Sequence, residues 1–201
     1  MARHRLSFAK GHMGLSTCKT KPKPPPPPPG PVWVPWSQTR YPHQAVSVAE
    51  MYHVPWQNPQ NCEVEDGNIT MCAFEGSGES EMLRGFDFQF SMPVGATCTG
   101  AFLELKKRSV IPPGTSDQGV YLLLHPYVQS ENKYNPANWP PVLTWFEYGS
   151  DSDTWGITLT DSIVNDIQFT VGISAMRLSG DGAVAIDVMR LTLNGMELVL
   201  P

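Results

Sequence analysis

One run of residues, 182–194 (GAVAIDVMRLTLN), constrains the fold more than any other stretch of this chain. It is the longest β-type run, with an Asp-Gly turn pair before it and an Asn-Gly pair after it. Its apolar residues occupy even positions up to Val188 and odd positions from Met189, whereas a strand with one buried face keeps a single parity. The change predicts either burial on both faces or a β-bulge near Asp187, and we prefer the bulge.

Asp187 lies inside this apolar run. A buried carboxylate needs a partner, and the sequence offers Arg190 or a backbone amide. We therefore interpret Asp187 as a packing residue and not as a catalytic one.

Shorter runs of β type recur about every ten residues, with turn signals between them. They are residues 45–54, 69–74, 83–90, 99–108, 119–128, 142–148, 155–159 and 168–176. No helix of normal length is indicated, only a helical turn at 161–165 with Thr160 as its cap. This spacing predicts an all-β fold, an antiparallel, jelly-roll-like β-sandwich of about eight strands.

The first 40 residues differ sharply from the rest in charge. They hold half of the chain's 14 Lys and Arg residues and none of its 19 Asp and Glu residues. Residues 21–31 (KPKPPPPPPGP) must adopt polyproline II, because consecutive prolines fix φ and donate no hydrogen bonds. We expect a basic, proline-rich, extended arm over 1–40 and a sandwich domain over 41–201.

The arm is expected to bind a partner, with cations orienting it and tryptophans anchoring it. A disordered tail is the alternative that composition alone favours. Nucleic acid is an unlikely partner because the charges are sparse and interrupted by prolines. The candidate partner-binding residues are Arg3, Arg5, Lys10, Lys19, Lys21, Lys23, Trp33 and Trp36.

The sequence predicts neither a transmembrane helix nor a secretory signal, so synthesis in the cytoplasm and reduced cysteines are expected. A disulfide between Cys62 and Cys72 is left open.

Catalysis has little support in the sequence. There is no nucleophile elbow, no phosphate-binding glycine loop and no metal-binding histidine pair. His125 lies in an apolar strand and is interpreted as structural. Asp151 and Asp153 could bind calcium, but an Asp/Ser turn explains them better. We expect no enzyme, no metal and no cofactor.

Sugar binding is the main alternative function. Sandwich proteins can bind glycans through exposed aromatic rings. Trp139, in a polar loop between prolines, and Tyr148 are the candidate glycan-binding residues, while Trp155 is expected in the core.

Several motifs occur in an order that resembles the β-sandwich domain of many tailed-bacteriophage structural proteins. The similarity covers residues 56–195. Its motifs are Trp56, Asn58-Pro59, Asp66-Gly67, residues 83–90 with Pro93, Gly95-Ala96 and Gly100, residues 155–161 (WGITLTD) and residues 186–193 (IDVMRLTL). The aromatic pair that ends the last strand in that family is Asn194-Gly195 here.

The resemblance implies a virion structural protein without catalytic residues. The arm would attach the sandwich to a capsid, neck or tail shell, as in a decoration protein, after synthesis in the host cytoplasm. Family analogy implies a homo-oligomer. The alternative is a glycan- or receptor-binding module of a tail or head fibre.

Overall fold

The computed structural model describes residues 23, 25–26, 28–49, 53–76, 78–112, 114–124, 128–178 and 180–200. By their contacts, residues 31–200 form one unit and residues 1–30 belong to another. Of residues 1–30, the structure describes Lys23 and a few Pro and Gly residues up to Gly30, all exposed and without regular secondary structure. Within the described ranges no helix has the length and apolar character needed to cross a membrane.

In the described part of residues 31–200, eleven strands form two antiparallel sheets, so the predicted all-β sandwich is confirmed. The strands are β1 Val32–Arg40, β2 Gln44–Val48, β3 Thr70–Phe74, β4 Gly78–Glu79, β5 Met82–Phe86, β6 Thr97–Ser109, β7 Thr115–Leu124, β8 Val128–Gln129, β9 Thr144–Gly149, β10 Thr170–Arg177 and β11 Gly182–Val199. A 3-10 turn, η1, spans Pro59–Cys62, and the predicted helical turn is α1, Asp161–Val164.

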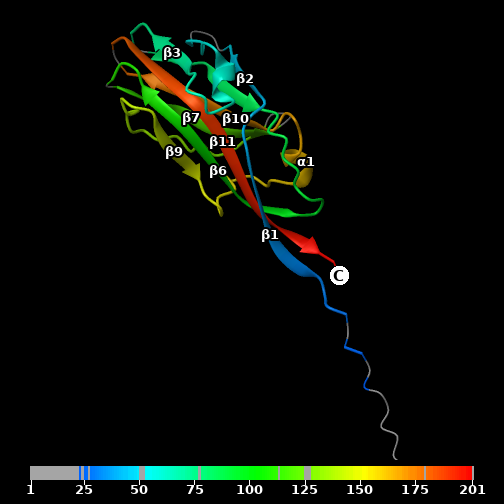
Figure 1. Cartoon of the computed structure of the whole chain (residues 1–201). Helices are drawn as coiled ribbons and strands as arrows, with labels where there is room; N and C mark the ends of the chain where they lie inside the picture. The colour runs from blue at the N-terminus through cyan, green and yellow to red at the C-terminus, as the bar shows by residue number, and fades with distance from the viewer. Residues whose placement is uncertain are drawn as a thin grey trace, which may run out of the picture. The chain divides into compact units, whose positions relative to one another are not determined.

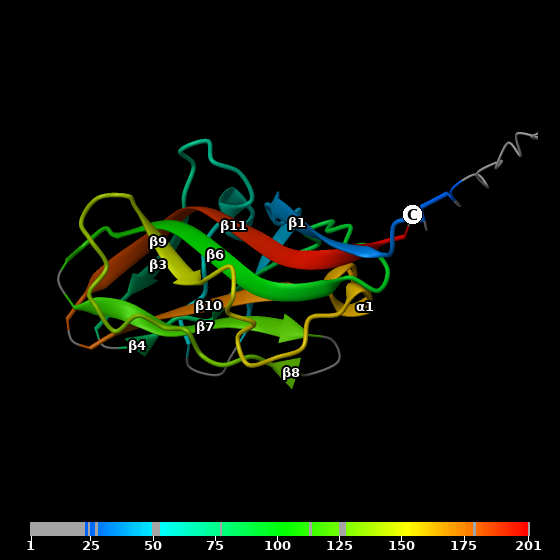
Figure 2. The ribbon, with the colours of Figure 1, turned by 90° about the horizontal axis from the view of Figure 1, so that it is seen from below.

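The two sheets lie as separate layers (Figure 2). Sheet A has the order β1-β11-β6-β9, and β3 also pairs with β11. Sheet B has the order β2-β5-β10-β7-β8, and β4 also pairs with β10. One apolar core fills the space between the layers, and it includes Leu103 and Leu105 from β6 and Val171 and Ile173 from β10.

Strand β11 runs through the middle of sheet A (Figure 1). Its pairing with β6 shifts register between Ile186 and Val188, which confirms the predicted bulge at Asp187. Residues 182–189 are also buried on both faces, and burial alternates only after them. The turn η1 packs against β11, so this first half has cover on both sides.

Asp187 has the backbone partner that the sequence suggested. Its Oδ1 accepts a hydrogen bond from the Gly67 N–H at 3.1 Å, and its Oδ2 lies 2.9 Å from Lys106 Nζ. The alternative partner Arg190 pairs instead with Glu104 on β6, with Nε and Nη2 each 2.6 Å from a carboxylate oxygen.

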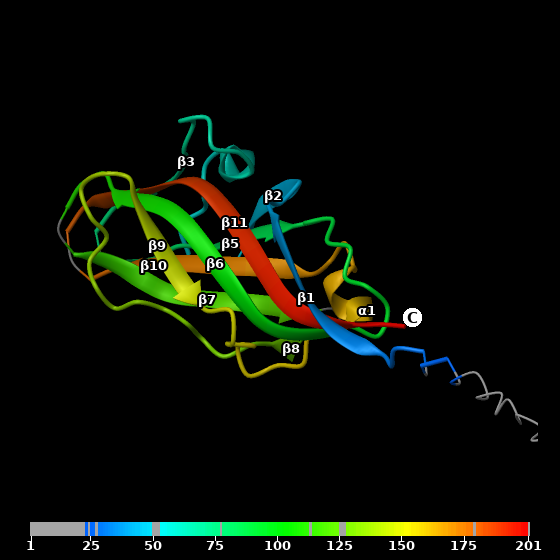
Figure 3. The ribbon, with the colours of Figure 1, turned by 60° about the horizontal axis from the view of Figure 1, so that its bottom comes forward.

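Strand β1 lies before the predicted domain boundary at residue 40. It pairs along the last part of β11, from Val32 opposite Val199 to Arg40 opposite Leu191 (Figure 3). Pro35 is tolerated because β1 is the outer strand of sheet A. The sandwich therefore begins within the stretch that we assigned to the arm.

The predicted strand over 83–90 ends early, at Phe86. Asp87 and Gln89 adopt positive φ angles, 56° and 52°, which a strand does not continue through. Phe88 and Phe90 are nevertheless buried, and their rings stack with centroids 5.8 Å apart. Among the described cysteines, Cys62, Cys72 and Cys98 are free thiols.

Candidate functional site

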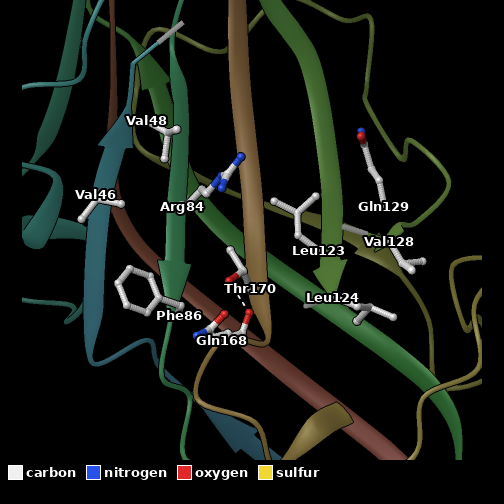
Figure 4. A pocket seen from close by; sticks show the side chains of 10 residues that line it. All are labelled: Val46, Val48, Arg84, Phe86, Leu123, Leu124, Val128, Gln129, Gln168 and Thr170. Atoms are coloured by element: carbon white, nitrogen blue, oxygen red, sulfur yellow. Dashed lines mark hydrogen bonds between the residues drawn. The ribbon is translucent and has the colours of Figure 1, made fainter. Parts of the chain in front are cut away.

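A groove of about 570 Å³ crosses the outer face of sheet B. Figure 4 shows side chains from neighbouring strands around it. They are Val46 and Val48 on β2, Arg84 and Phe86 on β5, Gln168 and Thr170 at the start of β10, Leu123 and Leu124 on β7, and Val128 and Gln129 on β8. We call this feature the sheet B groove.

Strand alternation places these side chains outside the core. Along β5, Leu83 and Gly85 are buried, whereas Arg84 and Phe86 between and after them are half-exposed. On β10, Val171 lies in the core and Thr170 faces the groove. Alternate residues of these strands therefore point away from the core, and those side chains line the groove.

Gly172 shapes the floor between β5 and β7. A Cβ at this position would lie 2.7 Å from Met82 Sδ and 2.9 Å from Leu123 Cδ1. The missing side chain lets these two residues close over β10. The floor is consequently apolar and shallow at this point.

Polar groups surround this apolar floor. Arg84 Nε is buried and has no hydrogen-bond partner among the described residues. The Thr170 hydroxyl donates to the Gln168 carbonyl oxygen at 2.8 Å, and Gln129 is exposed at the opposite side. The Arg84 side chain as a whole is half-exposed and lies at the groove (Figure 4), so its guanidinium can donate to an acceptor on a ligand.

The groove contains no catalytic constellation. None of its ten described lining residues is an Asp, Glu, His, Cys or Lys. Elsewhere in the described ranges, no group of three or more His, Cys, Asp or Glu side chains could hold a metal ion. What the groove offers is a surface for binding, with an apolar floor and hydrogen-bonding groups around it.

The two predicted glycan-binding aromatics lie elsewhere. The expected exposure of Trp139 is wrong, because its exposed fraction is 2% and Tyr148 is also buried. Their polar atoms bind one buried carboxylate, since Trp139 Nε1 donates to Asp117 Oδ1 and the Tyr148 hydroxyl donates to Asp117 Oδ2. Neither ring offers a face to a sugar. Trp155 lies in the core as predicted.

The predicted arm residues divide between described and undescribed positions. Trp36 packs against the core and contacts Gly195, so it docks on this chain, whereas the exposed fraction of Trp33 is 50%. Lys23 is exposed. The remaining basic residues, Arg3, Arg5, Lys10, Lys19 and Lys21, lie outside the described residues, as does His125. Their predicted binding role stays a prediction.

The sheet B groove was missed from the sequence, although one signal was present. Residues 121–124 (YLLL), within the strand predicted at 119–128, are apolar at both parities. Leu122 is fully buried, but Tyr121 and Leu123 are half-exposed on the outer face. Leu123, an apolar residue on the outer face of β7, is the part of this pattern that indicates the sheet B groove.

No family model matches the chain, and no curated protein matches it by sequence. Among solved structures, it is similar to a β-1,2-glucanase from Parabacteroides distasonis, with 11% identity and a TM-score of 0.38 over 77% of this chain. The chain spans only 22% of that glucanase.

Two further similar structures are carbohydrate-binding modules. One is the family 11 module of the cellulase Lic26A-Cel5E of Clostridium thermocellum, with 13% identity, a TM-score of 0.31 and coverage of 79% of this chain and 86% of that chain. The other is a CBM4 structure, with 12% identity, a TM-score of 0.31 and coverage of 84% and 94%. Likeness at this level carries no information about the ligands of this chain.

Proposed function

We propose that this chain is a non-catalytic binding module that holds an extended glycan in the sheet B groove. The observation that carries the proposal is the groove itself, an apolar floor across five neighbouring strands with the half-exposed Arg84 guanidinium beside it. This site replaces Trp139 and Tyr148 as the candidate glycan-binding surface.

The chemistry of the lining suits a sugar. A pyranose presents apolar C–H faces that pack on an aromatic ring, and Phe86 supplies such a ring. Its hydroxyls donate and accept hydrogen bonds, which Arg84, Gln129 and Gln168 can exchange with them. A concave apolar site with a few polar groups is typical of small-molecule recognition.

The same lining argues against hydrolysis. Glycosidases place two carboxyl groups on either side of the scissile bond. The ten described lining residues include no carboxylate, so none of them could act as the acid or the nucleophile of a glycosidase. We therefore assign binding and not turnover to this site.

A glycan array followed by titration calorimetry tests the proposal. Phe86→Ala should weaken binding by up to about tenfold, because one aromatic contact contributes about 0.5–1.5 kcal/mol. Arg84→Met should weaken it at least as much, because it removes a charged donor. Tyr134→Ala is the matched control, since Tyr134 is exposed and does not line the groove.

Two results would count against the proposal. One is an array on which the wild-type protein binds no glycan. The other is glycan binding that Tyr134→Ala weakens as much as Phe86→Ala does.

A second role, attachment to a larger protein assembly such as a virion shell, has its own support. Val32, Trp33, Leu198, Val199 and Leu200 are all exposed where β1 and β11 pair at their ends. Exposed apolar side chains gathered in one place are typical of contact surfaces. The proposed partner is another protein of the particle, and the proposed location is the virion.

Deletion of residues 1–30 tests this second role without removing β1. The truncated protein keeps the exposed apolar patch but lacks six basic residues of the arm, so it should fold but join particles poorly. Trp33→Ser changes the patch itself and should also reduce incorporation. Normal incorporation of both variants would refute attachment through this end.

A further inference from the structure

Five polar and aromatic residues form a closed cluster between the two sheets. Lys107 comes from β6, Tyr148 and Phe146 from β9, Asp117 from β7, and Trp139 from the loop before β9. Lys107 and Asp117 have exposed fractions of 0% and 1%. The cluster therefore joins sheet A to sheet B in an environment without bulk water.

The Asp117 carboxylate is held by several donors. Lys107 Nζ and Trp139 Nε1 donate to Oδ1, the latter at 2.7 Å. The Tyr148 hydroxyl and the Asn135 N–H donate to Oδ2, at 2.8 and 2.9 Å. The carboxyl group is thus fixed in orientation, with a separate donor set on each oxygen.

Tyr148 also links the two charged groups. Its hydroxyl accepts a hydrogen bond from Lys107 Nζ at 2.5 Å while it donates to Asp117 Oδ2. This arrangement gives a proton a path from the amine to the carboxyl oxygen. Three rings close over Nζ, with centroids 4.2, 4.5 and 5.2 Å away for Trp139, Phe146 and Tyr148.

The surroundings favour an uncharged amine. Burial lowers the pKa of Lys107 to about 8, although the Asp117 carboxylate opposes this shift. Transfer of one proton from the ammonium to the carboxylate produces an amine and a carboxylic acid and requires no exchange with solvent. A buried, deprotonated lysine is a competent nucleophile.

We propose that Lys107 and Asp117 condense to an isopeptide bond that joins the two sheets covalently. In this step Nζ bonds to Cγ of Asp117 and the Cγ–Oδ2 bond breaks. The ammonium gives up two protons, which leave with Oδ2 as one water molecule. No oxidant or reductant is needed.

Each neighbour of the carboxyl group has a role in this step. The Trp139 Nε1–H stabilises the negative charge that develops on Oδ1, which becomes the amide oxygen. Tyr148 carries a proton from Nζ to Oδ2, and the raised pKa that burial gives its hydroxyl keeps it protonated. The strands supply the proximity, because they hold the amine and the carboxyl group in contact.

The reaction also removes an unfavourable pair of charges. Burying an ammonium and a carboxylate costs desolvation energy that their attraction only partly returns. An amide is neutral, and its carbonyl oxygen keeps the Trp139 donor. The product is therefore better suited to this environment than the ion pair.

Mass spectrometry of the denatured full-length protein tests the proposal. The wild-type chain should be lighter than its sequence mass by one water molecule. A succinimide at Asp66-Gly67 or Asp181-Gly182 would give the same loss, so the deciding result is a branched peptide that contains both Lys107 and Asp117. A wild-type chain at full sequence mass, or one without the branched peptide, would overturn the proposal and leave a buried ion pair.

Variants on the same strand sharpen the test. Lys107→Met should restore the full mass, whereas Lys106→Met, on the opposite face of β6, should still lose water. Tyr148→Phe keeps both reacting groups and should slow the mass loss, followed over time in newly synthesised protein that has not yet reacted. An unchanged rate in Tyr148→Phe would overturn the role of Tyr148 as the proton carrier.

Discussion

Lys106 and Lys107 are neighbours on β6, and each pairs with a buried aspartate on a different face of the strand. Lys106 Nζ lies 2.9 Å from Asp187 Oδ2 and 2.8 Å from Glu65 Oε1, and 24% of its side chain is exposed. Lys107 pairs with Asp117, and both side chains are fully buried. The two pairs share their chemistry and differ in access to water.

This difference reverses the pKa shift. Hydrogen bonds from Lys106 to Glu65 and Asp187 raise its pKa above the usual value. Burial lowers the pKa of Lys107 to about 8. Solvent therefore decides whether the lysine of a buried Lys–Asp pair is held in its charged form or shifted towards its neutral form.

The largest expected effect is that of Asp117→Ala. It leaves Lys107 buried beside three aromatic rings without its carboxylate, and breaking a buried pair in this way costs about 3–5 kcal/mol. The free energy of unfolding from urea titration measures the loss. A loss below about 1 kcal/mol would mean that water reaches the cluster.

Exchanging each lysine for methionine separates the two sites further. Lys107→Met should destabilise the protein by about 2 kcal/mol, because it removes the link from β6 to Asp117 while Asp117 keeps its Trp139, Tyr148 and Asn135 donors. Lys106→Met should cost below about 1 kcal/mol, because its partners are reached from a partly exposed position. Equal losses for the two variants would contradict the comparison.

Asp187→Asn should lower the free energy of unfolding by about 1 kcal/mol. The asparagine oxygen can still accept from the Gly67 N–H, and only the charge opposite Lys106 is lost. Urea titration of this variant, compared with Asp187→Ala, measures the separate contribution of the Gly67 bond. If the two variants lose equal stability, that bond contributes nothing.

The last prediction concerns chemical labelling of the two lysines and involves no substitution. An amine-reactive ester applied to the folded protein should label Lys106 but not Lys107, as read from a peptide digest. Labelling of Lys107 in the folded state would show that its amine is neither enclosed nor bonded.

Local pattern predicted part of this structure. The parity change in residues 182–194 located the bulge, because a pleated strand allows a change of face only through an extra residue. The need of a buried carboxylate for a partner predicted either Arg190 or a backbone amide at Asp187, and the structure has the amide of Gly67. Strand β1 was missed because its proline and two tryptophans follow a polyproline run and give no alternation.

The sites depend on contacts that sequence spacing does not contain. Trp139 looked exposed in its polar loop, but its ring belongs to the core and its Nε1 donates to Asp117, 22 positions earlier. The sheet B groove requires knowing which strands are neighbours, since β2 and β5 lie beside β10 and β7 only in the folded sheet. The pattern of residues along one strand predicts neither the contact between Trp139 and Asp117 nor the order of the strands in sheet B.

The pairing of β1 with the end of β11 has a mechanical consequence. Val32 and Val199 lie opposite each other, and the two strands run antiparallel from there into the sandwich. A pull on the chain at these two points would load the hydrogen bonds of the ladder one after another instead of all together. The sandwich would therefore yield by peeling β1 away from its tip, well before any tension reached the layer that carries the groove.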